Sequence, residues 1–174
     1  LSIVQNSGVW DNNIFSYPVF DIDSYEKAST RSDILNFIFL EEKIYTDEIN
    51  KLLIEDKTIV VILMNSDAHS IMVQRKFIID MMNRGVRVPV IINRTYNTSA
   101  NLDFQLKSSI DIGSLLIDGL GDGVWLEFGS DKGLVNQTVF GILQASRMRI
   151  SKTEYISCPS CGRTLFDLQE TTSK

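Results

Sequence analysis

Cysteine, histidine, proline and net positive charge are all scarce in this chain, and the scarcities exclude several classes of protein. The 174 residues include two cysteines, one histidine and three prolines. Two cysteines are too few for a scaffold built on disulfides. The net charge of −5, from 17 basic and 22 acidic residues, argues against general binding to nucleic acid or to an anionic membrane surface. The longest purely apolar run, Ile59–Met64, is far shorter than the roughly 20 residues of a membrane span.

What remains is the composition of a globular protein. Apolar residues make up 44% of the chain and charged residues 22%, which excludes a disordered, collagen-like or coiled-coil chain. A chain of this length buries roughly 70% of its unfolded surface, so it can build a core. It starts with Leu1 rather than Met, and no signal peptide follows. We therefore expect it to be a piece of a longer protein.

Short β-branched runs alternate with longer stretches of helical periodicity. The pattern predicts strands at 17–22, 58–64, 88–92, 114–118 and 124–128, and helices over 46–55, from Ser66 to a C-terminal Gly85, over 99–112 ending at Gly113, and over 134–148. Strands that alternate with helices of this length favour parallel pairing through right-handed crossovers. The predicted fold class is therefore α/β, and periodicity alone does not distinguish an open sheet from part of a barrel.

A domain boundary is predicted near residue 150. Residues 1–150 keep the α/β rhythm, and beyond them both cysteines, Cys158 and Cys161, fall in one Cys-Pro-Ser-Cys-Gly turn. Two thiolates at this spacing suit half of a zinc ribbon, part of an iron–sulfur cluster, or a redox pair. Either metal site needs further ligands, and the single histidine, His69, lies far upstream. The missing ligands are expected beyond Lys174.

Four other features have both a functional and a structural interpretation, and the structural one is favoured for each. They are the glycine-rich turn 119–123, His69, the pair Asp21 and Asp23, and the basic cluster of Arg147, Arg149 and Lys152. The turn lacks the Gly-Lys-Ser/Thr of a phosphate loop and precedes a strand rather than a helix. His69 suits a helix cap, the acidic pair suits a polar strand end, and the basic cluster suits a solvated linker.

Three blocks near the C-terminus resemble one enzyme family. They are Gly-Ser-Leu-Leu-Ile-Asp-Gly-Leu-Gly-Asp-Gly at 113–123, Gln-Ala-Ser-Arg-Met-Arg at 144–149, and the long block 152–169 that contains Cys-Pro-Ser-Cys-Gly-Arg. They resemble consecutive blocks of the large, three-domain form of hydroxymethylbutenyl diphosphate synthase, an oxidoreductase of the methylerythritol phosphate route to isoprenoids. The resemblance is strong over about the last 60 residues and looser at 88–92 and 101–110.

The resemblance implies a reaction and a cofactor. The family opens methylerythritol cyclodiphosphate with loss of water and uptake of two electrons, which a ferredoxin or a flavodoxin supplies. A [4Fe–4S] cluster delivers the electrons and is held by three cysteines and one glutamate. Cys158 and Cys161 match the first two cysteines, so both are cofactor-binding and metal-ligating candidates. The family's third cysteine and its glutamate correspond to positions beyond Lys174.

The resemblance also implies an architecture. Residues 1–150 correspond to the later part of a TIM-barrel-like insertion domain, and 151–174 to the start of a truncated iron–sulfur domain. The substrate barrel is absent, and the strand Val-Trp-Leu-Glu at 124–127 is poor in phosphate donors. No catalytic residue is therefore assigned, the piece is interpreted as a structural spacer, and the isolated fragment is expected to be inactive.

Location, self-association and one alternative complete the expectations. The bacterial cytoplasm is the simplest location, and plants offer a plastid form. Because a barrel cut partway exposes strand edges, we expect a homodimer or a covered edge. The alternative function is a freestanding α/β binding module with a zinc-ribbon-like CxxC tail. Sequence beyond Lys174 would decide between them: one cysteine and a glutamate for the synthase, a second CxxC for the ribbon.

Overall fold

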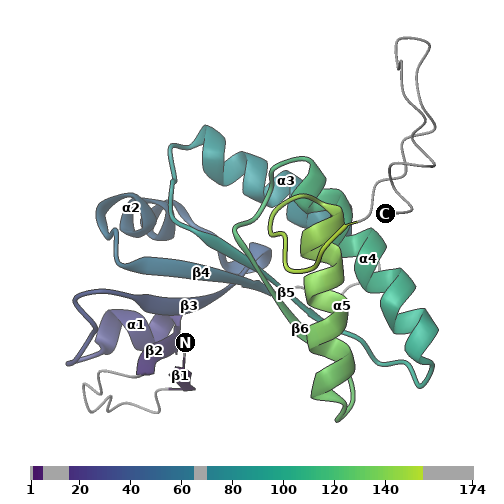
Figure 1. Cartoon of the computed structure of the whole chain (residues 1–174). Helices are drawn as coiled ribbons and strands as arrows, with labels where there is room; N and C mark the ends of the chain where they lie inside the picture. Colours follow the sequence, from purple (N-terminus) through teal and green to yellow (C-terminus); the bar gives the residue numbers. More distant parts are fainter. Residues whose placement is uncertain (1, 6–15, 65–69, 155–174) are drawn as a thin grey trace, which may run out of the picture.

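The computed structural model describes residues 2–5, 16–64 and 70–154, and within them strands and helices alternate (Figure 1). The elements are β1 (Ser2–Gln5), β2 (Ser16–Asp21), α1 (Ile22–Lys27), β3 (Asn36–Glu41), the short 3₁₀ turn η1 (Glu42–Ile44), α2 (Asp47–Glu55), β4 (Ile59–Met64), α3 (Ser70–Asn83), β5 (Val90–Thr95), α4 (Asn101–Ile117), β6 (Gly123–Glu127) and α5 (Lys132–Ala145). The predicted α/β class is confirmed.

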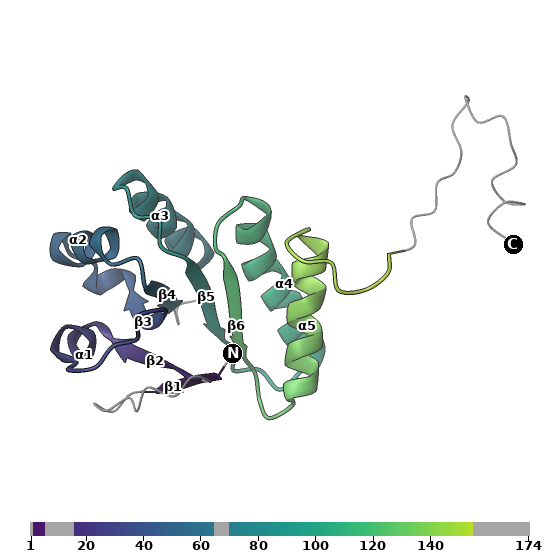
Figure 2. The same ribbon diagram turned by 60° about the vertical axis from the view of Figure 1, so that its left-hand side comes forward.

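The sheet has the strand order of a barrel wall. Its order is β1-β2-β3-β4-β5-β6, and every pairing is parallel. Right-handed crossovers that always step in the same direction place every helix on one face, whereas a doubly wound sheet reverses and uses both. Figures 1 and 2 show the helices on one side of a curved sheet. The fold is therefore a partial βα-barrel, with β1 and β6 as its edges.

Each face of the sheet carries its own apolar cluster. The larger cluster lies between sheet and helices and includes Ile59, Val61 and Leu63, which are at most 1% exposed. The smaller one lies on the other face and includes Val60 and Ile62. Successive residues of a strand point to opposite faces, so β4 is apolar throughout because both of its faces are covered. This confirms the interpretation of 58–64 as a doubly buried strand.

Helix α3 ends as its sequence predicts. Gly85 has φ +88°, a left-handed conformation that glycine adopts without steric cost. Its N–H donates to the carbonyl of Met82, and the N–H of Val86 donates to the carbonyl of Met81. These two bonds satisfy carbonyls that the helix end would otherwise leave free. The chain then turns into β5, which starts just after Pro89.

The predicted strand at 114–118, and the helix end at Gly113, are wrong. Helix α4 runs without interruption through Gly113 to Ile117. Leu115 and Leu116 are at most 2% exposed on the sheet side of this helix, so their burial outweighs the roughly 1 kcal/mol that an internal glycine costs. The helix ends instead just before Gly119, which has φ +73°. As at Gly85, two backbone hydrogen bonds close the helix end: the N–H of Gly119 donates to the carbonyl of Leu116, and the N–H of Leu120 donates to the carbonyl of Leu115.

The remaining predicted elements are close to those observed. The strands predicted at 17–22, 88–92 and 124–128 correspond to β2, β5 and β6, and the helices at 46–55 and 134–148 correspond to α2 and α5. The sequence pattern did not predict β1, the short α1 or β3. The run Asn-Phe-Ile-Phe-Leu-Glu at 36–41 was the available signal for β3, which pairs with β4 along its whole length.

Candidate functional site

The carboxyl ends of the strands are where parallel α/β folds place their functional groups. In this chain β5 and β6 end side by side on that rim, at Thr95 and Glu127. The hydroxyl of Thr95 donates to Glu127 at 3.4 Å, and the N–H of Tyr96 donates to the carbonyl of Glu127. Asp21 and Glu41 end β2 and β3 on the same rim, so its described part carries three carboxylates, of which Glu127 accepts from Thr95.

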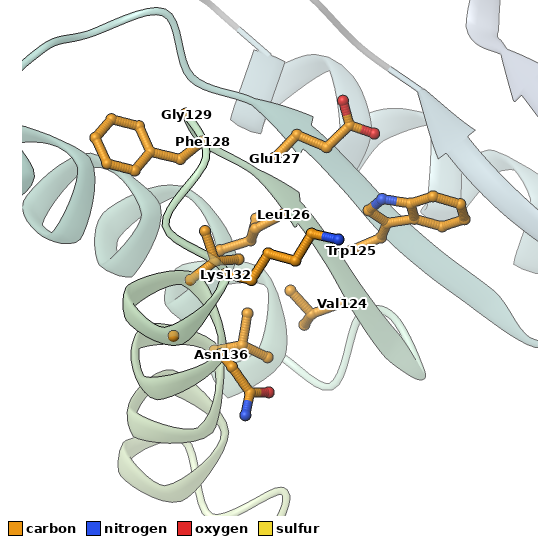
Figure 3. A pocket seen from close by; sticks show the side chains of 11 residues that line it. Val124, Trp125, Leu126, Glu127, Phe128, Gly129, Lys132 and Asn136 are labelled. Carbon is orange, nitrogen blue, oxygen red and sulfur yellow. The ribbon is translucent and has the colours of Figure 1, made fainter. Parts of the chain in front are cut away.

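A cavity of about 800 Å³ lies between β6 and α5. Its polar lining consists of Glu127, Lys132 and Asn136, and the rest is mainly apolar. Figure 3 shows the Lys132 side chain extending from α5 toward β6, whereas the Trp125 ring points away from α5. Because β6 is an edge strand, this cavity lies beside a strand edge that pairs on one side only. The cavity therefore combines an amine, a carboxylate and an amide with largely apolar walls.

A buried ion pair joins β5 to α4 next to that rim. Arg94, 8% exposed, donates from Nη2 to Asp111 Oδ2 at 2.5 Å, and the Tyr96 hydroxyl donates to the same oxygen at 2.9 Å. Burial, reinforced by the charge of Asp111, raises the pKa of Tyr96 well above its ordinary value, so the phenol remains a donor. Arg94 Nη1 has no hydrogen-bond partner within the described structure.

This triad braces the helix layer against the sheet. Arg94 follows Ile92 on the helix-facing side of β5, and all three polar groups are at least half buried. Sequence analysis did not find it, because a buried arginine and its partner seventeen positions later carry no local signature. The packing of α4 on β5 alone brings them together.

The glycine-rich turn 119–123 serves packing, as favoured from the sequence. It precedes β6, at the end of the sheet opposite the carboxyl rim. The Asp122 carboxylate accepts from the N–H of Val90 at 2.9 Å, and the Asp122 N–H donates to the Val90 carbonyl at 2.7 Å. Gly121 has φ +93°, and a Cβ there would lie 2.6 Å from Ile92 Cδ1. No helix begins at this turn, so it offers no helix N-terminus for a phosphate.

The acidic pair Asp21 and Asp23 does not form a shared site. Asp21 caps α1 and accepts from the Ser24 N–H at 2.8 Å and from the Ser24 hydroxyl at 2.9 Å. The backbone hydrogen bond from Ser24 lowers the pKa of Asp21 despite some desolvation. Asp23 is exposed in the first turn of the same helix. Both residues therefore serve the start of α1.

The basic cluster near the end of α5 is engaged within its own segment. Arg147 pairs with Glu154 at 2.6 Å, and the Arg149 guanidinium lies 5.1 Å from the centre of the Phe140 ring. The side-chain oxygen of Gln144 accepts from the N–H of residues 151 and 152. Residues 147–154, which we call the strap, are thus folded back onto α5. The three basic residues are exposed, as the solvated interpretation predicts, and a link between two domains stays a prediction.

His69 and the two cysteines, Cys158 and Cys161, lie outside the described residues. Across 2–5, 16–64 and 70–154, no group of three or more His, Cys, Asp or Glu side chains could hold a metal ion. None of the described helices has both the length and the apolar character needed to cross a bilayer. The geometry defines a class, a piece of a βα-barrel with parallel strands in sequential order.

Comparison with known proteins relates the sequence of this chain to one enzyme family. A synthase of Parabacteroides distasonis, "4-hydroxy-3-methylbut-2-en-1-yl diphosphate synthase (flavodoxin)", is 40% identical over 99% of this chain and 28% of its own length. The protein of that name from Phocaeicola vulgatus is 38% identical over 100% of the chain and 29% of its own length. A rice protein, "4-hydroxy-3-methylbut-2-en-1-yl diphosphate synthase (ferredoxin), chloroplastic", is 48% identical over 52% of the chain.

These relationships confirm the resemblance expected from the sequence. The chain is homologous, along essentially its whole length, to one stretch of the 4-hydroxy-3-methylbut-2-en-1-yl diphosphate synthases. It spans less than a third of the length of these relatives. No protein-family model and no solved structure matches it.

Proposed function

We propose that this chain is part of a large, three-domain hydroxymethylbutenyl diphosphate synthase, which reductively converts methylerythritol cyclodiphosphate in non-mevalonate isoprenoid biosynthesis. The observation that carries the proposal is the match of 98–100% of the chain to synthases from several bacteria, which takes in the Cys-Pro-Ser-Cys turn. The names of the relatives specify flavodoxin or ferredoxin. A carrier of one of these two kinds is the electron donor of the proposed parent enzyme.

Residues 1–150 act as a structural spacer in this proposal. Their sheet and helices share one large core, and their polar clusters cap, brace or pack. A rigid piece of this kind can fix the distance between a substrate barrel and a redox module. Positioning matters because a misplacement of about 1 Å at a reacting centre can cost on the order of 100-fold in rate.

Cys158 and Cys161 would supply two of the ligands of a [4Fe–4S] cluster. Thiolates are the ligands that such clusters select, and two of them three positions apart fit one side of the cluster. When bound, the cluster supplies the electrons for reductive ring opening. In the family that the chain resembles, the third cysteine and the glutamate correspond to positions beyond Lys174, so the other ligands would come from elsewhere in the parent protein. The isolated chain is therefore expected to hold no stable cluster and to be inactive.

The open edges of the sheet bear on self-association. β1 and β6 each pair on one side only. In the parent enzyme, further strands of the insertion domain would close the barrel between them, and in the isolated chain a second copy would cover them. The proposed location is the bacterial cytoplasm, and the chloroplastic rice relative favours a plastid form in plants.

The test uses the full-length parent enzyme, reconstituted with iron and sulfide without oxygen. Cys158→Ser and Cys161→Ser should each remove most of the iron–sulfur absorbance and the reductase activity, because a cluster ligand is lost. Ser160→Ala, between the two cysteines, is the matched control and should retain both. An intact cluster and full turnover in Cys158→Ser would overturn the assignment. Stoichiometric zinc without iron in the wild-type protein would favour the zinc-ribbon alternative.

A further inference from the structure

Helix α4 carries a row of apolar side chains on the face turned away from the core. The row consists of Leu102, Leu106, Ile110 and Ile117, which are 66%, 55%, 63% and 72% exposed. At 100° per residue they fall, together with Gly113, within an arc of about 80°. Phe104 and Ile112, both 0% exposed, lie on the opposite side of the helix. We call these four side chains the α4 stripe; Gly113 lies in the same arc but is buried, in the groove beside α5.

The second half of the stripe borders a groove between α4 and α5. The groove has a volume of about 340 Å³ and is lined by Ile110, Gly113, Ile117, Gly141, Ala145 and Ser146, among others. A Cβ added at Gly113 or at Gly141 would meet nothing within 4 Å. The floor of the groove is therefore open to an incoming apolar side chain.

The size of this surface indicates which kind of partner it suits. Four side chains that are more than half exposed amount to on the order of 400 Å² of apolar surface, which is the size of the largest patch on a typical monomer, and such patches are often functional. A stable complex between separate proteins buries about 800 Å² on each side, roughly twice as much. A covalently tethered module needs less, because the tether supplies an effective concentration of about 1 mM. The relatives are more than three times as long as this chain, so in a protein of that length further modules would be tethered to this one.

The strap determines which tethered module is nearest. Ser146 lines the groove and ends α5, and the strap that follows is held by Gln144 and by the pair Arg147–Glu154. Figures 1 and 2 show α4 and α5 side by side, with the strap leaving from the C-terminal end of α5. Whatever follows residue 154 is therefore tethered at the end of the groove.

We propose that the α4 stripe and its groove are the docking surface for the C-terminal module that begins with residues 155–174. This rests on the proposed function, in which that module carries Cys158 and Cys161. The segment supplies few large apolar side chains, namely Tyr155, Ile156, Leu165, Phe166 and Leu168, too few for a core of its own. Docking would give the cysteine module a fixed resting position on the barrel wall.

The two cysteines allow a direct test in the 174-residue chain, because no other thiol is present. Cys161→Ser leaves Cys158 for a nitroxide spin label, and methyl NMR then reports which leucines and isoleucines lie near it. We expect Leu106 and Ile110 to lose more than half of their signal. Leu102 is the sharpest reporter, because it lies about 22 Å from Ile117 along the helix, away from the tether.

A charged substitution in the stripe distinguishes docking of the segment from mere proximity caused by its tether. Ile110→Glu should restore the Leu102 and Leu106 signals, because a carboxylate in the stripe opposes apolar burial. Ile34→Glu is the matched control: Ile34 is 66% exposed, lies outside the stripe and should leave the broadening unchanged. Unbroadened Leu102 and Leu106 signals in the labelled protein would overturn the proposal.

Two further outcomes are distinguishable. Broadening in isotope-labelled chains mixed with separately spin-labelled chains would mean contact between copies, which overturns the proposal in favour of a second copy on the stripe. The ligand role of the cysteines is tested separately, by cluster absorbance in the parent enzyme. Loss of docking therefore leaves the proposed function standing, and retention of the cluster in Cys158→Ser removes the proposed function without touching the docking result.

Discussion

The Asp111 carboxylate is the shared acceptor of the brace between β5 and α4, and removing it should be costly. Asp111→Ala leaves the Arg94 guanidinium, 8% exposed, without the partner of its Nη2, while its Nη1 already lacks one in the described structure. The same change orphans the Tyr96 hydroxyl. The substitution therefore creates an uncompensated buried charge and one lost hydrogen bond.

Both effects have known magnitudes. Breaking a buried ion pair by removing one partner costs about 3–5 kcal/mol. The lost hydrogen bond from the Tyr96 hydroxyl to the charged carboxylate adds about 1.5–3 kcal/mol. The sum, about 4.5–8 kcal/mol, is comparable with the whole stability of a typical domain, about 5–15 kcal/mol. Arg94→Met combined with Asp111→Leu removes both charges and should recover most of the loss.

Urea unfolding followed by far-ultraviolet circular dichroism measures these differences as shifts of the midpoint at constant slope. The matched control is Asp103→Ala on the same helix. Asp103 pairs with Lys107 at 2.7 Å, but both side chains are about half exposed, so its removal should cost under about 1 kcal/mol. An Asp111→Ala protein within about 1 kcal/mol of wild type, or a double variant no more stable than the single one, would refute the reasoning.

Two further predictions concern other parts of the fold. Burial, with the hydrogen bond to Asp56, raises the pKa of Tyr25 to about 12, above the value of about 10 in the unfolded chain. The stabilisation from Tyr25 should therefore be complete below about pH 10 and be lost as the pH rises through about 12, and urea midpoints of Tyr25→Phe should decline less over that range. Gly121→Ala should lower the urea midpoint by an amount equivalent to about 1–3 kcal/mol, because it combines a positive φ with a contact of 2.6 Å to Ile92; an unchanged midpoint would contradict the packing role of the turn.

Local patterns predicted the elements that depend on local chemistry. The β-branched run Ile59–Met64 became a doubly covered strand, and Gly85 ended α3 in the left-handed conformation. The run 114–118 was assigned wrongly because a short apolar stretch has no period long enough to separate a strand from a buried helix turn. Its context decided it: Leu115 and Leu116 complete the buried face of α4.

The apolar spacing that predicted the helix over 99–112, namely Leu102, Leu106 and Ile110, shows the same difference between what local pattern and what packing decides. It correctly indicated a helix, but it could not indicate which side of the helix meets the sheet, because a repeat of 3.6 residues fixes a face and not its orientation. The structure turns these residues outward and buries Phe104 and Ile112 instead. The apolar pattern marked a docking surface rather than the core.

The sequence by itself determined the α/β class, the CxxC motif and the resemblance to the synthases, because composition, periodicity and contiguous motifs are local properties of the chain; the boundary near residue 150 stays a prediction. Only the tertiary structure decided that the strands follow one another around a partial barrel, that Arg94 and Asp111 meet in its wall, and that α4 presents an apolar stripe outward. These features depend on which elements pack together, and packing is settled by burial of the whole chain rather than by any single segment.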